Sequence, residues 1–214
     1  MFAEDRWMRG QTVTSFFVPP LCVACRGGAD RGSLLCGVCL ADLESSGPLR
    51  GKPPPGVDRL VSCAGHDGVA RSVLAAFKFQ QLLEVSGLIA CRMCLALGEP
   101  GPGTLVVPVP ASPVRRRLRG FDAAESLAVL IADEFALPLG RAGLRRVGTG
   151  RQRGRGRSGR LGSPPDIRAA KKISGPVLLV DDVTTTGATL SACASALRSS
   201  GAGSVDAVTF TSRL

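Results

Sequence analysis

The segment VLLVDDVTTTGATL, Val177 to Leu190, decides the expected fold. Its first four residues are apolar, which is typical of a strand that is buried on both faces. Two aspartates and a Thr/Gly turn follow, and the residues after the turn place Leu190, Cys193 and Leu197 on one face of a helix. The segment therefore predicts a strand that passes through a turn into a helix, which is the repeating unit of an α/β sheet.

The rest of the chain from Val57 onward alternates between the same two patterns. Short apolar runs predict strands at 60–64, 104–110, 144–147, 176–182 and 204–211. Helical apolar spacing predicts helices at 68–80, 82–97, 121–135 and 188–199. This alternation implies an α/β fold with a mostly parallel sheet flanked by helices. Ligands of such sheets bind beyond the carboxyl ends of the strands.

The residues after strand 176–182 have the chemistry of a sugar-phosphate site. The turn offers backbone N–H groups and hydroxyls at the start of a helix, a setting that favours one phosphate. Its residues are Thr184, Thr185, Thr186, Gly187, Ala188 and Thr189. Asp181 and Asp182 would repel that phosphate unless they accept hydrogen bonds from sugar hydroxyls or hold water on a Mg²⁺. Ribose 5-phosphate satisfies both halves, and the alternative is a turn capped by Asp and Thr without a ligand.

An arginine cluster follows the strand predicted at 104–110. Arginine suits phosphate recognition because its planar guanidinium donates two hydrogen bonds to one anion. The cluster and its glycine comprise Arg115, Arg116, Arg117, Arg119 and Gly120. We expect it to contact a phosphorylated ligand at the same edge of the sheet, and a surface cluster with no ligand is the competing interpretation.

The chain is strongly basic, with 27 Lys and Arg against 17 Asp and Glu and a net charge of +10. This balance favours polyanionic partners, although genomic composition also explains a preference for Arg, Ala and Gly. Residues 141–165 contain eight arginines and no acid, among them Arg151, Arg153, Arg155 and Arg157. With so few apolar side chains this segment is expected to be mobile, and one interpretation is an RGG-like contact with nucleic-acid backbone.

The N-terminal cysteines have the spacing of a metal site. Cys22-x2-Cys25 is followed ten residues later by Cys36-x2-Cys39. Two such knuckles can surround one Zn²⁺ with four thiolates, which gives a closed, structural site. A pair of disulfides is the alternative. The other four cysteines, Cys63, Cys91, Cys94 and Cys193, fall in apolar strand or helix patterns and are expected in the core.

Several classes of protein are excluded or disfavoured by composition. The single histidine, His66, rules out sites built from two or three histidines in one chain, and no G-x-S-x-G elbow accompanies it. No apolar run approaches the ~20 residues that span a bilayer, so no membrane insertion is expected. The N-terminus lacks the apolar core of a signal peptide, so a cytoplasmic location is expected.

The 177–190 segment resembles the phosphoribosyl pyrophosphate (PRPP) signature of type I phosphoribosyltransferases. The resemblance implies that Asp181 and Asp182 contact the ribose hydroxyls and that 184–189 hold the 5′-phosphate. RRRLRGFD, residues 115–122, resembles the pyrophosphate loop of that family. The resemblance also implies Mg²⁺ as cofactor, and makes the basic segment around Arg151 the candidate for the flexible loop that closes over pyrophosphate.

The whole arrangement resembles the ComF family, whose members accompany DNA uptake in competent bacteria. It runs from the four-cysteine knuckle (19–45), through a Pro/Gly-rich linker (47–56), into a phosphoribosyltransferase-like domain (57–214). Family members usually read Arg-Gly-Phe-Asn-Gln where this chain has Asp122 and Ala123 after Phe121. A carboxylate there would weaken anion binding or add a metal contact.

Two functional hypotheses follow. The first is a Mg²⁺-dependent phosphoribosyltransferase or hydrolase that acts on PRPP or a related ribose phosphate, with an acceptor base that the sequence does not identify. The second is a non-catalytic adaptor that handles single-stranded DNA beside a competence helicase. The acid pair favours the first hypothesis, since a binding module has no evident use for two carboxylates beside a phosphate loop.

Overall fold

A four-stranded parallel sheet forms the centre of the molecule in the computed structural model, which describes residues 20–79, 84–141, 143–147 and 165–213. The strands lie in the order β1 (Arg59–Gly65), β6 (Ala202–Ser212), β5 (Gly175–Thr184) and β2 (Leu105–Pro108). All three pairings are parallel, as the alternating pattern predicted. The apolar run Val177–Val180 occupies β5, between two other strands, where both of its faces are buried.

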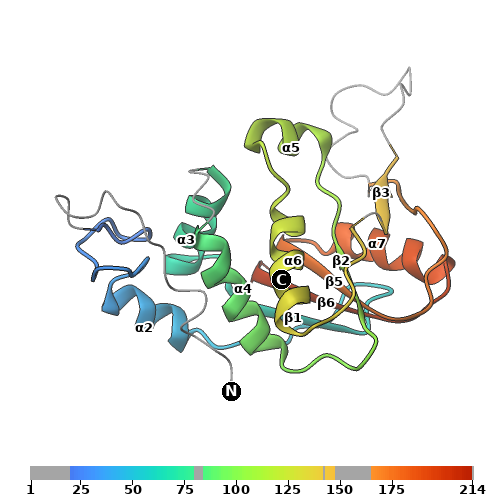
Figure 1. Cartoon of the computed structure of the whole chain (residues 1–214), viewed down its shortest axis with the longest axis horizontal. Coiled ribbons are helices and arrows are strands. Elements are labelled where there is room, and N and C mark those ends of the chain that lie inside the picture. Colours follow the sequence, from blue (N-terminus) through green and yellow to red (C-terminus); the bar gives the residue numbers. More distant parts are fainter. Residues whose placement is uncertain (1–19, 80–83, 142, 148–164, 214) are drawn as a thin grey trace.

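Helices cover both faces of this sheet (Figure 1). Leu178 and Val180 of β5 belong to a buried cluster with α3 (Gly68–Phe79), α4 (Glu84–Leu97) and α6 (Ala123–Glu134). Val177 and Leu179 belong to a second cluster with α7 (Ala188–Ser199). Successive side chains of a strand point to opposite faces, so the two clusters lie on opposite sides of the sheet.

Three elements were not predicted from the sequence. The second knuckle opens a helix, α2 (Gly37–Ser45), and the arginine cluster itself forms α5 (Pro113–Arg119) rather than a loop. The strand expected at 144–147 is β3 (Leu144–Arg146), and it pairs antiparallel with β4 (Ile167–Ala169) outside the main sheet. Leu144 of β3 and Ile167 of β4 belong to the buried cluster on the α7 side of the sheet.

The Pro/Gly-rich segment 47–56 lies along the protein rather than away from it. The backbone of Leu49 exchanges hydrogen bonds of 2.8 and 3.0 Å with Ser62 of β1. Ser191 Oγ on α7 donates to the Pro55 carbonyl at 2.9 Å, and Arg198 Nε donates to the Gly56 carbonyl at 2.9 Å. These bonds hold the segment against the helix that begins at the Thr/Gly turn.

Within the described ranges, no helix combines the length and the apolarity that a membrane crossing requires.

Candidate functional site

A cavity of about 140 Å³ lies where β2 and β5 end and α7 begins. Strand ends and a helix N-terminus therefore meet at the edge where ligands of parallel sheets bind. The residues lining it are Val109, Pro110, Ala111, Ser112, Arg119, Asp122, Ala123, Ala124, Arg146 and the continuous run 181–190. The acid pair, the Thr/Gly turn and one arginine of the predicted cluster are thus brought together.

The two aspartates have different surroundings because β5 continues through both of them to Thr184. In an extended strand neighbouring side chains point to opposite faces. Asp182 therefore points to the face covered by α3, where it is buried, and its Oδ2 lies 2.7 Å from Lys78 Nζ and 3.7 Å from Arg119 Nη1. Asp181 is half-buried, and its Oδ1 accepts a hydrogen bond from the Asp182 backbone N–H at 2.8 Å.

The Thr/Gly turn combines a helix N-terminus with an unsatisfied hydroxyl. Thr184 is 3% exposed, and its Oγ1 finds no hydrogen-bond partner within the described part of the chain. Gly187 is the N-cap of α7, with φ of 71°, and Thr186 Oγ1 accepts from the Ala188 N–H at 3.4 Å. The first N–H groups of a helix have no partner inside the helix. Ala188 and Thr189 line the cavity, so the N-terminus of α7 lies at its wall.

Among the arginines of the predicted cluster whose side chains the structure describes, Arg119 alone reaches this cavity. Arg119, at the last residue of α5, lines it, whereas Arg116 and Arg117 are exposed on the same helix and do not. A helix turns about 100° per residue, so successive side chains cannot converge on one point. Gly120 follows α5 with φ of 75° and lies outside the lining. The side chain of Arg115, and the four arginines 151, 153, 155 and 157, lie outside the described residues.

Three charged residues of the site were not singled out as ligand-binding residues from the sequence. Arg146 of β3 lines the cavity, and its Nε donates to the Pro110 carbonyl at 2.8 Å. Asp122 also lines it, but its carboxylate caps α6 and accepts from the N–H groups of Glu125 and Ala111, both at 3.4 Å. Lys78 lies behind Asp182. The sequence feature that could have indicated Lys78 is its position as a single cation between Phe77 and Phe79 in an apolar helix pattern.

Electrostatics around the acid pair are shaped by burial. Burial lowers the pKa of Lys78, and the Asp182 carboxylate partly opposes that shift. His66, which follows β1, also has a lowered pKa, because of burial and of the nearby cations Arg213, Lys78 and Arg71. The two aspartates at the carboxyl edge of the sheet therefore lie near several cations, which offset their negative charge.

The four N-terminal cysteines converge as their spacing predicted. The sulfurs of Cys22, Cys25, Cys36 and Cys39 all lie within 4.8 Å of one another. The Sγ atoms of Cys25 and Cys36 are 3.8 Å apart, and all four thiols are free. Four sulfurs arranged tetrahedrally at a Zn–S distance of about 2.3 Å would be about 3.8 Å apart, far beyond a disulfide bond of about 2.05 Å. The group can therefore hold a metal ion.

Local structure explains why these thiols suit a metal. Cys36 is the N-cap of α2 and Cys39 lies three residues further on the same face, at the helix end that favours thiolates. Burial raises the pKa of Cys22, but backbone N–H groups of Cys25, Cys36 and Ala24 outweigh it and bring the value to about 6. Burial raises the pKa of Cys39, and its three thiol neighbours add to the rise. The Cys22 thiol therefore loses its proton more easily than a free thiol, as a metal ligand must.

The remaining cysteines lie apart from this group. Cys63, Cys94 and Cys193 are buried among apolar side chains, as predicted, and burial raises the pKa of each thiol. Cys91 was also predicted in the core, but it is half-buried on α4 and belongs to neither buried cluster.

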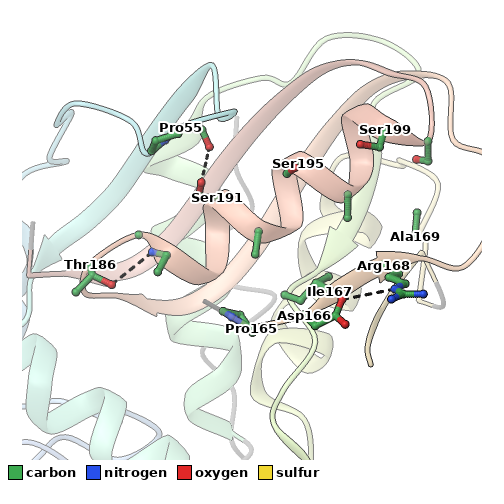
Figure 2. Close-up of a pocket in the computed structure, with 15 residues that line it drawn as sticks. Pro55, Pro165, Asp166, Ile167, Arg168, Ala169, Thr186, Ser191, Ser195 and Ser199 are labelled. Atoms are coloured by element: carbon green, nitrogen blue, oxygen red, sulfur yellow. Dashed lines mark hydrogen bonds and ion pairs between the residues drawn. The ribbon is translucent and has the colours of Figure 1, made fainter. Parts of the chain in front are cut away.

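A larger groove of about 860 Å³ adjoins the cavity along α7 (Figure 2). Ser191, Ser195 and Ser199 line it from the helix, and Asp166, Ile167, Arg168 and Ala169 line it from β4 and the residue before it. The two hollows share Thr186, Gly187 and Ala188, so the Thr/Gly turn lies between them.

Comparison of the chain with protein-family models and with curated proteins gives no match.

Proposed function

We propose that this protein binds PRPP or a related ribose phosphate in the cavity at the carboxyl edge of the sheet, and acts as a phosphoribosyltransferase of the ComF type. The observation that carries the proposal is Thr184. Burying a hydroxyl without a hydrogen-bond partner costs about 1–3 kcal/mol of folding free energy. A ligand oxygen that bonds to the Thr184 hydroxyl, close to the N-terminus of α7, would explain why this buried group is present. The alternative, a turn capped by Asp and Thr without a ligand, does not explain an unpartnered buried hydroxyl.

Each part of the ligand would meet a different group of residues. The 5′-phosphate would accept hydrogen bonds from Thr184 and from the N–H groups at the start of α7. The ribose hydroxyls would donate to Asp181 and Asp182. Pyrophosphate would lie against Arg119 and Arg146, which line the same cavity. Charge develops on the pyrophosphate as the C1–O bond breaks, and fixed guanidinium groups stabilise it without reorganisation.

Mg²⁺ would accompany the pyrophosphate and neutralise part of its charge. Asp181, which is half-buried and lines the cavity, would hold its water ligands in addition to accepting from a ribose hydroxyl. Asp182 is already engaged by Lys78 and Arg119, so we assign it to the ribose rather than to the metal.

We further propose Zn²⁺ as the metal of the four-cysteine group. Four thiolates in a closed arrangement select zinc over harder cations, and they leave no coordination position for catalysis. The role of the ion would then be structural.

Thr184 provides the sharpest test of the ribose-phosphate proposal. Replacing it by Val preserves shape and removes the hydroxyl, so affinity for ribose 5-phosphate and PRPP should fall about tenfold to a hundredfold, as expected for a hydrogen bond to a charged group. The stability of Thr184→Val should be unchanged or higher, because no internal hydrogen bond is lost. Isothermal titration calorimetry and urea unfolding measure the two quantities.

Thr209→Val is the matched control. Thr209 is also fully buried, but its Oγ1 lies 2.8 Å from Ser62 Oγ, so this variant should lose about 1–3 kcal/mol of stability and keep its affinity. Equal ligand affinity in Thr184→Val and the parent would remove Thr184 from the site. A parent protein that binds single-stranded DNA and no ribose phosphate would favour the adaptor instead.

A further inference from the structure

Lys78 and Asp182 form an ion pair in the interior of the protein, immediately behind the cavity. Their side chains are 9% and 8% exposed, and Nζ lies 2.7 Å from Oδ2. Lys78 belongs to α3, whose neighbouring residues Val73, Leu74 and Phe77 are buried apolar side chains of the same helix. An ion pair in such surroundings is often no more stabilising than a well-packed apolar pair, because both charges lose their hydration. Stability alone therefore gives a weak reason for this pair.

The charges around the cavity give a stronger reason. Three carboxylates line it, those of Asp122, Asp181 and Asp182, against two guanidinium groups, those of Arg119 and Arg146. These described lining residues would leave an excess of one negative charge beside a site for phosphate. Lys78 is not part of the lining, but its ammonium restores the balance from behind.

The pair also controls geometry. Lys78 Nζ and Arg119 Nη1 both approach Oδ2 of Asp182, and the Asp182 N–H donates to Oδ1 of Asp181. A ribose hydroxyl would then donate to the other oxygen of this carboxylate, Oδ1. An ammonium anchored in the apolar interior limits rotation of that carboxylate more than solvent would.

We propose that Lys78 is a positioning residue for the ligand site, which orients the Asp182 carboxylate toward ribose and cancels its charge so that a phosphate can bind beside it. This inference rests on the proposed ribose-phosphate function. It adds a residue that does not touch the ligand and acts through Asp182.

The test compares five proteins by calorimetry with ribose 5-phosphate, at a temperature where circular dichroism shows each to be folded: the parent, Lys78→Met, Arg59→Met, Asp182→Asn and the double variant Lys78→Met/Asp182→Asn. Lys78→Met should bind about tenfold or more weakly than the parent, the loss expected for a charged hydrogen bond of about 1.4 kcal/mol or more. Arg59→Met is the matched control, because it removes an ion pair of 3.0 Å with Asp206 at the opposite end of β1. Its affinity should be unchanged.

The double variant Lys78→Met/Asp182→Asn keeps the proposal falsifiable if Lys78→Met does not fold, since it leaves no unpaired buried charge. Because Lys78 acts through Asp182, the double variant should bind no more weakly than Asp182→Asn alone. Unchanged affinity in Lys78→Met, or a double variant tenfold weaker than Asp182→Asn, would overturn the role of Lys78 while leaving the proposed function intact. Absence of ribose 5-phosphate binding by the parent would overturn both.

Discussion

His66 is the one imidazole of the chain, and it interacts electrostatically with Lys78 and Asp182. It follows β1, where its backbone N–H donates to the Ser212 carbonyl at 2.8 Å and its Nδ1 lies 2.9 Å from Thr211 Oγ1. Burial, and then Arg213, Lys78 and Arg71, lower its pKa, while Asp182 opposes them. The imidazole thus reports the balance of charge at the carboxyl edge of the sheet.

We expect His66 to titrate below its usual pKa of 6.5 in the folded protein. In protein without a histidine tag, the imidazole proton signals in NMR spectra belong to this residue alone, so the midpoint is read directly. As the pH falls below 6.5 the unfolded chain takes up the proton first, so His66 lowers stability in that range. A midpoint at or above 6.5 would contradict this electrostatic description.

Arg213→Gln separates the influence of charge from that of burial. Removing the strongest of the neighbouring cations should move the His66 midpoint upward. Arg168→Gln, on β4 and paired with Asp166, should leave it in place. The shift should shrink at high salt, because interactions between exposed charges are screened.

At the level of residues, the sequence predicted the kinds of group in the site better than their partners. The Asp181 and Asp182 pair was recognisable because it follows an apolar run. The difference between its members arises because β5 continues through both, so that their side chains point to opposite faces of the sheet. Lys78 and Arg146 could not be assigned in advance. Arg146 lines the cavity from β3 and Lys78 lies behind it on α3, both far from the acid pair in the chain. Long-range packing, which periodicity does not encode, places them there.

At the level of elements, Gly187 also depends on packing between segments that are far apart in the chain. The turn at 184–189 requires a residue with positive φ at the N-cap of α7, which glycine adopts without strain. A Cβ at this position would also lie 2.7 Å from Pro54 Cβ. The second requirement comes from the segment 47–56, predicted as a linker, which packs against the turn.

Gly187→Ala should therefore cost more stability than its conformation alone explains. We expect a loss of about 2–5 kcal/mol, from positive φ and from overpacking together. Gly175→Ala is the control, since it has φ of 82° and open space around the added Cβ, and it should lose about 1–2 kcal/mol. Urea unfolding compares the two, and equal losses would show that Pro54 gives way.

The arginine cluster shows where element prediction failed. Residues 115–122 resemble a pyrophosphate loop, so a loop was expected there, at the end of a strand. Arginine is also a good helix former, and residues 113–119 form α5. As a helix the cluster directs Arg116 and Arg117 to the surface and leaves Arg119 at the cavity.

At the scale of the whole molecule, the cysteine group is continuous with the core on one face of the sheet. Cys22, Cys39 and Leu43 belong to the same buried cluster as Phe77 of α3 and Met93 of α4. The α7 face has its own cluster on the other side of the sheet. The α/β class and the convergence of four cysteines followed from pattern and spacing, but this continuity did not, because it depends on how α2 packs against α3.

Metal removal should therefore affect one face of the molecule more than the other. Chelation should strip about one ion per chain and increase amide hydrogen exchange first in residues 20–45, then in α3 and α4, because they share a buried cluster with the cysteine group. Amides of α7 should stay protected longest. Exchange measured by mass spectrometry resolves these segments.

Cys25→Ser should show the same pattern without chelator, and chelator should change it no further. Cys91→Ser is the control, because Cys91 and Cys94 have the spacing of a knuckle but lie on α4. This variant should retain its metal and the amide exchange of the parent. Equal loss of protection on both faces would mean that the sheet does not separate the two clusters, and full metal content in Cys25→Ser would place the ion elsewhere.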